Sequence, residues 1–140
     1  MQLSVFVVED NPEIHENLVG ALEELTCVKV VGGAAAEEDA LAWIAANDRW
    51  DMLIVDLFLK GGSGMRLVQR VRRSRPEQKI IVFSNYVNAS VRKRCAQLGV
   101  DAVFDKSTEI DALVDYCSHQ CTQLGAQSTL APEHPSGGPA

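Results

Sequence analysis

Short apolar runs alternate with segments of helical periodicity along most of the chain. The apolar runs are rich in β-branched residues and nearly free of charge, which is typical of parallel strands buried on both faces. They predict five strands, at residues Leu3–Val8, Val28–Gly32, Met52–Val55, Lys79–Phe83 and Asp101–Phe104.

The segments between these strands carry apolar residues at helical spacing. In the first segment Asn11 is the expected N-cap and Pro12 the first helical residue, a position that tolerates proline. Further helices are predicted at Ala40–Ala46, Leu67–Val71 and Val91–Leu98, and Gly99 is expected to end the last of these. A final helix is expected after Ser107-Thr108, with an apolar face of Ile110, Leu113, Val114 and Cys117.

Strict alternation of strands and helices predicts an α/β fold with a doubly wound parallel sheet. With right-handed crossovers, the common five-stranded arrangement is the flavodoxin-like order 2-1-3-4-5. The chain has 140 residues, enough for about one domain. The hydrophobic pattern ends near Gln123, so we predict one domain over residues 1–122 and a disordered tail over residues 123–140.

Composition narrows the class of protein further. The net charge of −6 disfavours direct nucleic-acid binding, and the basic residues are not interleaved with aromatic residues. No apolar run is long enough for a membrane helix, and the N-terminus does not resemble a signal peptide. The four cysteines lack CxxC spacing, which favours a reducing compartment. We therefore expect a cytoplasmic protein without membrane insertion, in which Cys117 and Cys121 are free thiols.

Polar residues stand where the predicted strands end. Glu9 and Asp10 follow the first strand, Asp56 follows the third, Ser84 follows the fourth and Lys106 follows the fifth. Ligands of such sheets bind beyond the carboxyl ends of the strands. In the order 2-1-3-4-5 these four strands are neighbours, so the five side chains are expected to converge on one pocket.

Three converging carboxylates require a counterion, because two like charges ~4 Å apart repel by roughly 1–4 kcal/mol. Oxygen ligands favour a hard cation, so Mg²⁺ is the expected cofactor and Mn²⁺ is expected to substitute for it. Asp56 is then the candidate nucleophile toward a phosphoryl group. Ser84 can donate a hydrogen bond to a phosphoryl oxygen, and Lys106 can neutralise its charge.

The chain resembles a response-regulator receiver domain of two-component signal transduction, from Leu3 to about Cys121. The resemblance lies in the motifs Val7-Val8-Glu9-Asp10-Asn11, Leu53-Ile54-Val55-Asp56-Leu57, Gly64, Val82-Phe83-Ser84-Asn85 and Val103-Phe104-Asp105-Lys106-Ser107. It implies that Glu9 and Asp10 hold Mg²⁺ and that Asp56 accepts a phosphoryl group and also binds the metal. It further implies a metal contact from the backbone carbonyl of Phe58, a switch formed by Ser84 and Phe104, and a phosphate-binding role for Lys106.

The resemblance implies a stand-alone phosphoacceptor in a two-component system or phosphorelay. A sensor histidine kinase or a phosphotransfer protein is the expected partner for phosphorylation. An output protein, or a second phosphorylated copy, is expected to bind the face formed by helix four, strand five and helix five. Arg92, Lys93 and Arg94 on helix four are the candidate contacts. Catalysis is expected only as assisted self-phosphorylation and self-dephosphorylation.

The sequence departs from the family pattern at several positions. Lys60 stands where the family usually has proline, which predicts a more mobile loop over residues 60–64. Phe104 replaces the commoner tyrosine, so switching is expected to depend on packing without a hydroxyl. Phe58 and Tyr86 lie near the expected path of a hydrolytic water, and we hypothesise that their bulk slows self-dephosphorylation.

Three other functions use the same fold. A phosphate-independent pseudo-receiver would keep the pocket only as a structural metal site and would bind its partner equally well after Asp56→Asn. A Mg²⁺-dependent phosphatase with an aspartate nucleophile usually has a second aspartate two residues later, where this chain has Phe58. Flavin binding is disfavoured because the first strand–helix loop is acidic and would repel a flavin phosphate.

Overall fold

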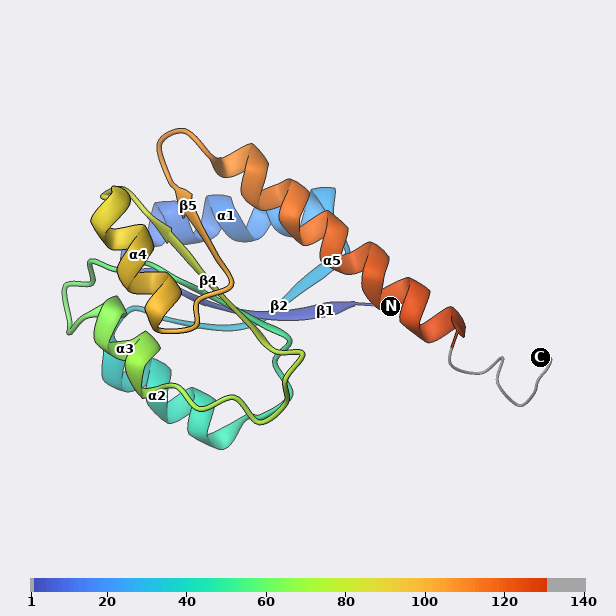
Figure 1. The fold of residues 1–140 in the computed structure, drawn as a ribbon, viewed down its shortest axis with the longest axis horizontal. Helices are drawn as coiled ribbons and strands as arrows, with labels where there is room; N and C mark the ends of the chain where they lie inside the picture. Colours follow the sequence, from blue (N-terminus) through green and yellow to red (C-terminus); the bar gives the residue numbers. More distant parts are fainter. Residues whose placement is uncertain (1, 131–140) are drawn as a thin grey trace.

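Five strands alternate with five helices over residues 2–130, the part of the chain that the computed structural model describes (Figure 1). The strands are β1 Leu3–Val8, β2 Val28–Ala34, β3 Met52–Val55, β4 Lys79–Ser84 and β5 Ala102–Asp105. The helices are α1 Pro12–Leu25, α2 Glu37–Ala46, α3 Gly64–Arg70, α4 Ala89–Gln97 and α5 Ile110–Leu130. All ten elements were predicted, with ends displaced by a few residues.

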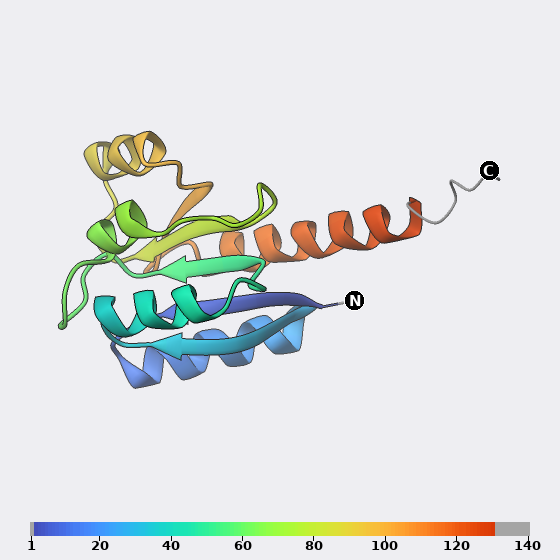
Figure 2. The same ribbon diagram turned by 90° about the horizontal axis from the view of Figure 1, so that it is seen from below.

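The strands form one parallel sheet in the order β2-β1-β3-β4-β5, which confirms the predicted topology. Helices α1 and α5 cover one face, and α2, α3 and α4 cover the other (Figures 1 and 2). β2 is an edge strand. Its pairing with β1 is shifted by a bulge opposite Val5 and Phe6 of β1, so that Phe6 pairs with Gly32. All five strands point the same way, so their carboxyl ends lie along one edge of the sheet.

Each face of the sheet has its own hydrophobic core. Beneath α1 and α5, Leu18, Leu22 and Leu113 pack on Val5 and Ile54. The core on the opposite face contains Trp50, which is only 2% exposed. Trp43 is half-buried instead and stacks on Phe6 with ring centroids 4.0 Å apart.

Helix α5 is longer than the sequence pattern predicted. It continues past residue 122 to Leu130, and Leu124 packs against the core beneath α1 and α5. No proline interrupts the segment before Pro132, so the helix can continue beyond the last strongly apolar turn. The helix therefore extends into the segment predicted as a disordered tail, and residues 131–140 of that segment lie outside the described part. Within residues 2–130, α5 and the other helices are too short or too polar to cross a membrane.

A disulfide joins Cys27, just before β2, to Cys121 on α5, with Cα atoms 5.9 Å apart. The prediction of a free thiol at Cys121 is wrong, because folding brings together two cysteines separated by 94 residues.

Cys95 and Cys117 are free and buried. Burial raises the pKa of the Cys117 thiol to about 12, so this thiol stays protonated and unreactive at neutral pH.

Candidate functional site

The polar residues at the strand ends converge around Asp56, as the topology predicted. The Ser84 hydroxyl donates to Asp56 Oδ1 at 3.0 Å, and the Lys106 ammonium donates to Asp56 Oδ2 at 2.8 Å. Asp56 is 7% exposed and Ser84 is fully buried. Each oxygen of this buried carboxylate therefore has a donor, one at the end of β4 and one just after β5.

Backbone contacts hold Asp56 in this position. Its N–H donates to the carbonyl of Val8 at 3.0 Å, which ties the end of β3 to the end of β1. On the other side, Gly64 begins α3 so close to Asp56 that an added Cβ would lie 1.9 Å from the Asp56 carbonyl oxygen. Only glycine fits there, so α3 packs directly on the turn that carries Asp56.

Lys106 bridges two carboxylates from different strands. Its Nζ contacts Glu9 Oε1 as well as Asp56 Oδ2, and its side chain is only 7% exposed. Burial lowers the pKa of Lys106, but the hydrogen bonds to Asp56 and Glu9 outweigh burial and leave the pKa above its usual value. The ammonium therefore stays charged and offsets the negative charge of the pocket.

The loop after β1 brings in the other two carboxylates. Glu9 Oε2 accepts the N–H of Asn11 at 3.1 Å, and Asn11 Oδ1 caps α1 by accepting the N–H of Glu13 and of Ile14. Asp10 is half-buried and accepts the N–H of Lys60 at 2.7 Å, from the loop between β3 and α3. The start of α1 and this loop together fix the acidic pair.

The carboxylates fit a divalent cation. Glu9, Asp10 and Asp56 each offer one oxygen, and these three oxygens lie within 4.8 Å of one another. All-oxygen donors suit Mg²⁺, which usually takes one or two carboxylates and keeps several waters. Phe58 follows Asp56 closely, and its N–H donates to Asp56 Oδ1 at 3.3 Å, so its backbone belongs to the same pocket.

Two aromatic side chains stand at the mouth of this pocket, which has a volume of about 190 Å³. Phe58 and Tyr86 both line it and pack edge to face, with ring centroids 5.1 Å apart. Phe58 is 55% exposed and Tyr86 is 68% exposed. The pair shields the carboxylates on one side and leaves an opening to solvent.

The remaining residues expected to act in switching lie on β5 and α4. Phe104 is half-buried and packs edge to face on Tyr116 of α5, with ring centroids 5.8 Å apart. Arg92 is paired with Glu109 at 2.9 Å and donates to the carbonyl of Val103, so it joins α4 to β5 and the start of α5. Arg92 is exposed like its neighbours Lys93 and Arg94, but its guanidinium is engaged within the chain.

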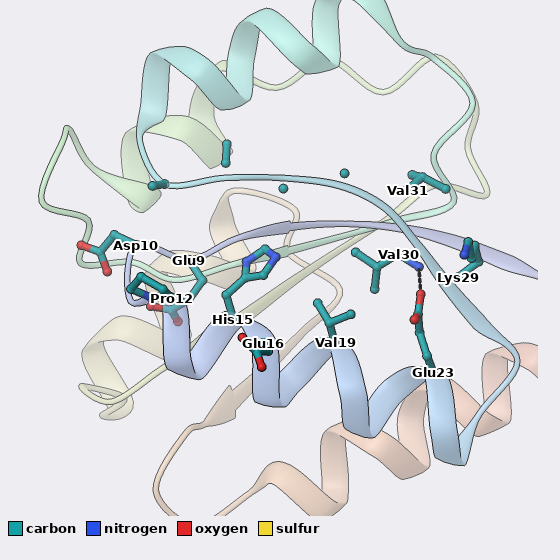
Figure 3. Close-up of a pocket in the computed structure, with 14 residues that line it drawn as sticks. Glu9, Asp10, Pro12, His15, Glu16, Val19, Glu23, Lys29, Val30 and Val31 are labelled. Atoms are coloured by element: carbon teal, nitrogen blue, oxygen red, sulfur yellow. Dashed lines mark hydrogen bonds between the residues drawn. The ribbon is translucent and has the colours of Figure 1, made fainter.

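A larger groove of about 820 Å³ runs between α1 and β2 and ends at Glu9 and Asp10 (Figure 3). The His15 ring lies over Gly33, where an added Cβ would be 2.4 Å from His15 Cε1. Glu23 accepts the N–H of Val30 at 2.9 Å, so a side chain from α1 caps one donor of this edge strand. Such capping and the bulge in β2 disfavour pairing with a further strand. His15 is half-buried in this groove.

One buried charged residue near the site was missed by the sequence reasoning. Glu37 begins α2, is 1% exposed and contacts Arg66 and Arg70 of α3 at 2.7–2.9 Å. Hydrogen bonding to Arg66, more than the cost of burial, sets the pKa of Glu37 at about 2. The only sequence signal was an acidic residue at a helix start, which ordinarily just complements the helix dipole.

Known proteins resemble this chain over most of its length. The chain matches the model of the response regulator receiver domain over residues 5–118. It is 24% identical over 141 residues to the response regulator UvrY of Escherichia coli strain K12, covering 94% of this chain and 64% of that protein. It is 27% identical over 108 residues to the methanol utilization control regulatory protein MoxX of Paracoccus denitrificans, covering 76% of this chain and 48% of that protein. The chain thus spans about half to two thirds of the length of these relatives.

Solved structures agree on the fold. A CheY-like receiver domain protein from Methanospirillum hungatei superposes with a TM-score of 0.73 at 20% identity, covering 91% of this chain and 99% of that one. A DNA-binding response regulator of the LuxR family from Staphylococcus aureus gives a TM-score of 0.71 at 18% identity, covering 81% and 93% of the two chains. With the family model matching most of its length, this chain belongs to the response-regulator receiver domain family.

Proposed function

We propose that this receiver is phosphorylated on Asp56 by a histidine kinase or phosphotransfer protein, with Mg²⁺ as cofactor. The observation that carries the proposal is the Asp56 carboxylate itself, held between Ser84 and Lys106 with Glu9 and Asp10 beside it. Receivers of this family are signalling domains, so the acidic pocket serves as a switch and has no turnover substrate.

The chemistry is a phosphoryl transfer to a carboxylate. An oxygen of Asp56 attacks the phosphorus of a phosphohistidine, the P–N bond breaks, and its electron pair returns to the imidazole, which takes up a proton. Lys106, already charged, neutralises a phosphoryl oxygen, and Ser84 turns its hydroxyl toward another. Glu9, Asp10, Asp56 and the carbonyl of Phe58 would hold Mg²⁺, which supplies further charge neutralisation when bound.

The signal would leave the site through Ser84 and Phe104. When Ser84 turns from Asp56 to the phosphoryl group, the space beside the end of β4 changes, and Phe104 can shift from its present packing on Tyr116. The switch would alter the face formed by α4, β5 and α5, where Lys93 and Arg94 are exposed to an output partner or a second phosphorylated copy. We propose that this occurs in the cytoplasm, where sensor kinases present their phosphohistidines.

Intact mass after incubation with Mg²⁺ and phosphoramidate tests the proposal. One added phosphoryl group is expected in the wild type, and none in Asp56→Asn or in a sample treated with a chelator. Asp48→Asn is a matched control, because Asp48 is exposed and lies outside the pocket. This variant should take up phosphate like the wild type.

Failure of the wild type to form the adduct, alongside a receiver of known activity that does form it, would reject the phosphoacceptor function. The pseudo-receiver would then be favoured. Its specific signature is partner binding that is the same in the wild type and in Asp56→Asn. Steady release of phosphate from small phosphoesters would instead revive the phosphatase alternative.

A further inference from the structure

The loop between β3 and α3 carries two groups that belong to the proposed metal site. Phe58 offers its backbone carbonyl, and the Lys60 N–H donates to Asp10 Oδ2. Both residues are exposed, and neither lies in a strand or helix. Their placement therefore depends on what anchors the loop.

The anchor is the start of α2. The N–H of Glu37 donates to the carbonyl of Gly61 at 2.9 Å, and Ala36 forms an isolated parallel bridge with Gly61. The Glu37 carboxylate accepts the N–H of Ser63 at 2.9 Å. This backbone bridge, which includes the Glu37 N–H bond, and the contact of the Glu37 carboxylate with Ser63 thus fix the loop immediately after Lys60.

The loop sequence is adapted to this contact. Gly62 has φ +100°, and an added Cβ would lie 2.5 Å from Glu37 Cβ and 2.7 Å from Glu37 Oε1. A side chain at this position would push the carboxylate away from Ser63. Gly61 and Gly62 therefore allow the start of α2 to approach the loop closely.

Two guanidinium groups hold the Glu37 carboxylate in place. Arg66 Nε donates to both oxygens at 2.9 and 2.8 Å, and Arg70 Nη1 donates to Oε2 at 2.7 Å. With the Ser63 N–H, the buried carboxylate has donors from three residues on the loop and α3. A carboxylate with this many charged donors has little freedom to move.

We propose that Glu37 is a positioning residue for the metal site: its carboxylate fixes the β3–α3 loop so that the Lys60 N–H orients Asp10 and Phe58 stays beside Asp56. This inference rests on the proposed Mg²⁺ site. Groups that orient metal ligands from outside typically change metal affinity by 10–100-fold when they are removed. Glu37 contacts the loop and does not contact a metal ligand itself. Its removal is therefore expected to change Mg²⁺ affinity by an amount near the lower end of this range.

The test is a titration of the full chain with MgCl₂, followed through the amide NMR signals of Phe58 and Lys60. Glu37→Ala should weaken Mg²⁺ binding about tenfold, and Glu37→Gln, which keeps an acceptor for Ser63, should weaken it less. Glu38→Gln is the matched control. Glu38 also contacts Arg70, at 2.6 Å, but it is 76% exposed and forms none of the contacts with Ser63.

Glu38→Gln is expected to bind Mg²⁺ like the wild type. Melting temperatures recorded for all variants separate positioning from stability, and if Glu37→Ala does not fold, Glu37→Gln decides. A folded Glu37 variant with a lower melting temperature but wild-type Mg²⁺ affinity would overturn the inference, as would equal weakening in Glu38→Gln. A wild type that binds no Mg²⁺ would instead reject the proposed metal site itself.

Discussion

Lys60 donates its backbone N–H to Asp10 Oδ2 at 2.7 Å, at a position where receivers usually have proline, which has no N–H to donate. The substitution was expected to make the loop more mobile. The structure shows that the extra donor is used, and that it contacts a carboxylate of the proposed metal site.

Lys60→Pro should therefore weaken Mg²⁺ binding about tenfold, because Asp10 loses a hydrogen bond that orients it. Lys60→Ala retains the N–H and should bind Mg²⁺ like the wild type. Calorimetric titration with MgCl₂ measures both dissociation constants. Equal affinity in the proline and alanine variants would show that this hydrogen bond does not support the metal site.

Most of the fold and the central site could be predicted because their signals are local. Runs of apolar residues define buried strands, and Asn11-Pro12 marks the start of α1. Once the strand order is inferred, the residues at the carboxyl ends of β1, β3 and β4 must meet at one edge of the sheet. Glu9, Asp56 and Ser84 do meet there.

The features that were missed depend on contacts between distant segments. Glu37 looks like an ordinary acidic residue at a helix start, and its burial follows only from the arrangement of α2 against α3. Cys27 and Cys121 pair because the fold places this turn of α5 beside the residue just before β2, which no spacing rule reveals. The net charge and the number of cysteines therefore describe the chain as a whole, but they do not reveal which charged residues or which cysteines pair in the fold.

Reduction of the Cys27–Cys121 disulfide should lower thermal stability. The bond closes a loop of more than ninety residues, for which loss of the cross-link typically costs about 2–4 kcal/mol. In a domain of this size that corresponds to roughly 10 °C in melting temperature. Thermal unfolding with and without dithiothreitol measures the effect.

Cys27→Ser is the control for this measurement. It should melt at the temperature of the reduced wild type and should not respond to dithiothreitol. Because cytoplasmic thiol pools keep most cysteines reduced, the same assay in glutathione buffers would show whether the bond persists under the conditions proposed for this receiver. A wild type with the same melting temperature in both redox states would contradict a stabilising role.

Acid should destabilise the chain partly through Glu37. Its pKa is about 2 in the folded chain against an ordinary value of 4.5, so the ionised carboxylate stabilises the fold fully above pH 4.5. This contribution is lost as the pH falls through about 2. Hydrogen bonds also lower the pKa of Asp105, chiefly from Ser107, and of Glu109, chiefly from the Asp105 N–H, so both act in the same direction.

Urea unfolding of the wild type and Glu37→Gln at pH 7 and pH 2.5 isolates the Glu37 contribution. The wild type should be more stable at pH 7, and the difference should shrink at pH 2.5. A difference that stays constant between the two pH values would mean that the charge of Glu37 does not stabilise the fold.

The aromatic pair at the mouth of the pocket should slow loss of the phosphoryl group. Phe58 and Tyr86 line the opening beside Asp56 and pack on each other, so a water that approaches the acyl phosphate from this side must pass them. Phe58→Asn combined with Tyr86→Ala opens the path and replaces an apolar surface with a polar one. We expect the phosphorylated form to decay several-fold faster, on the order of 1 kcal/mol in the barrier to hydrolysis.

Intact mass followed over time after removal of phosphoramidate gives the decay rate, with Mg²⁺ held at saturation. Leu25→Ala serves as the control, because Leu25 is an exposed apolar residue at the opposite end of α1 from the pocket. The two single variants should each give part of the acceleration, since either ring alone still covers some of the opening. An unchanged lifetime in the double variant would contradict the hypothesis and would leave access of water to be controlled by Lys106 and the metal ligands.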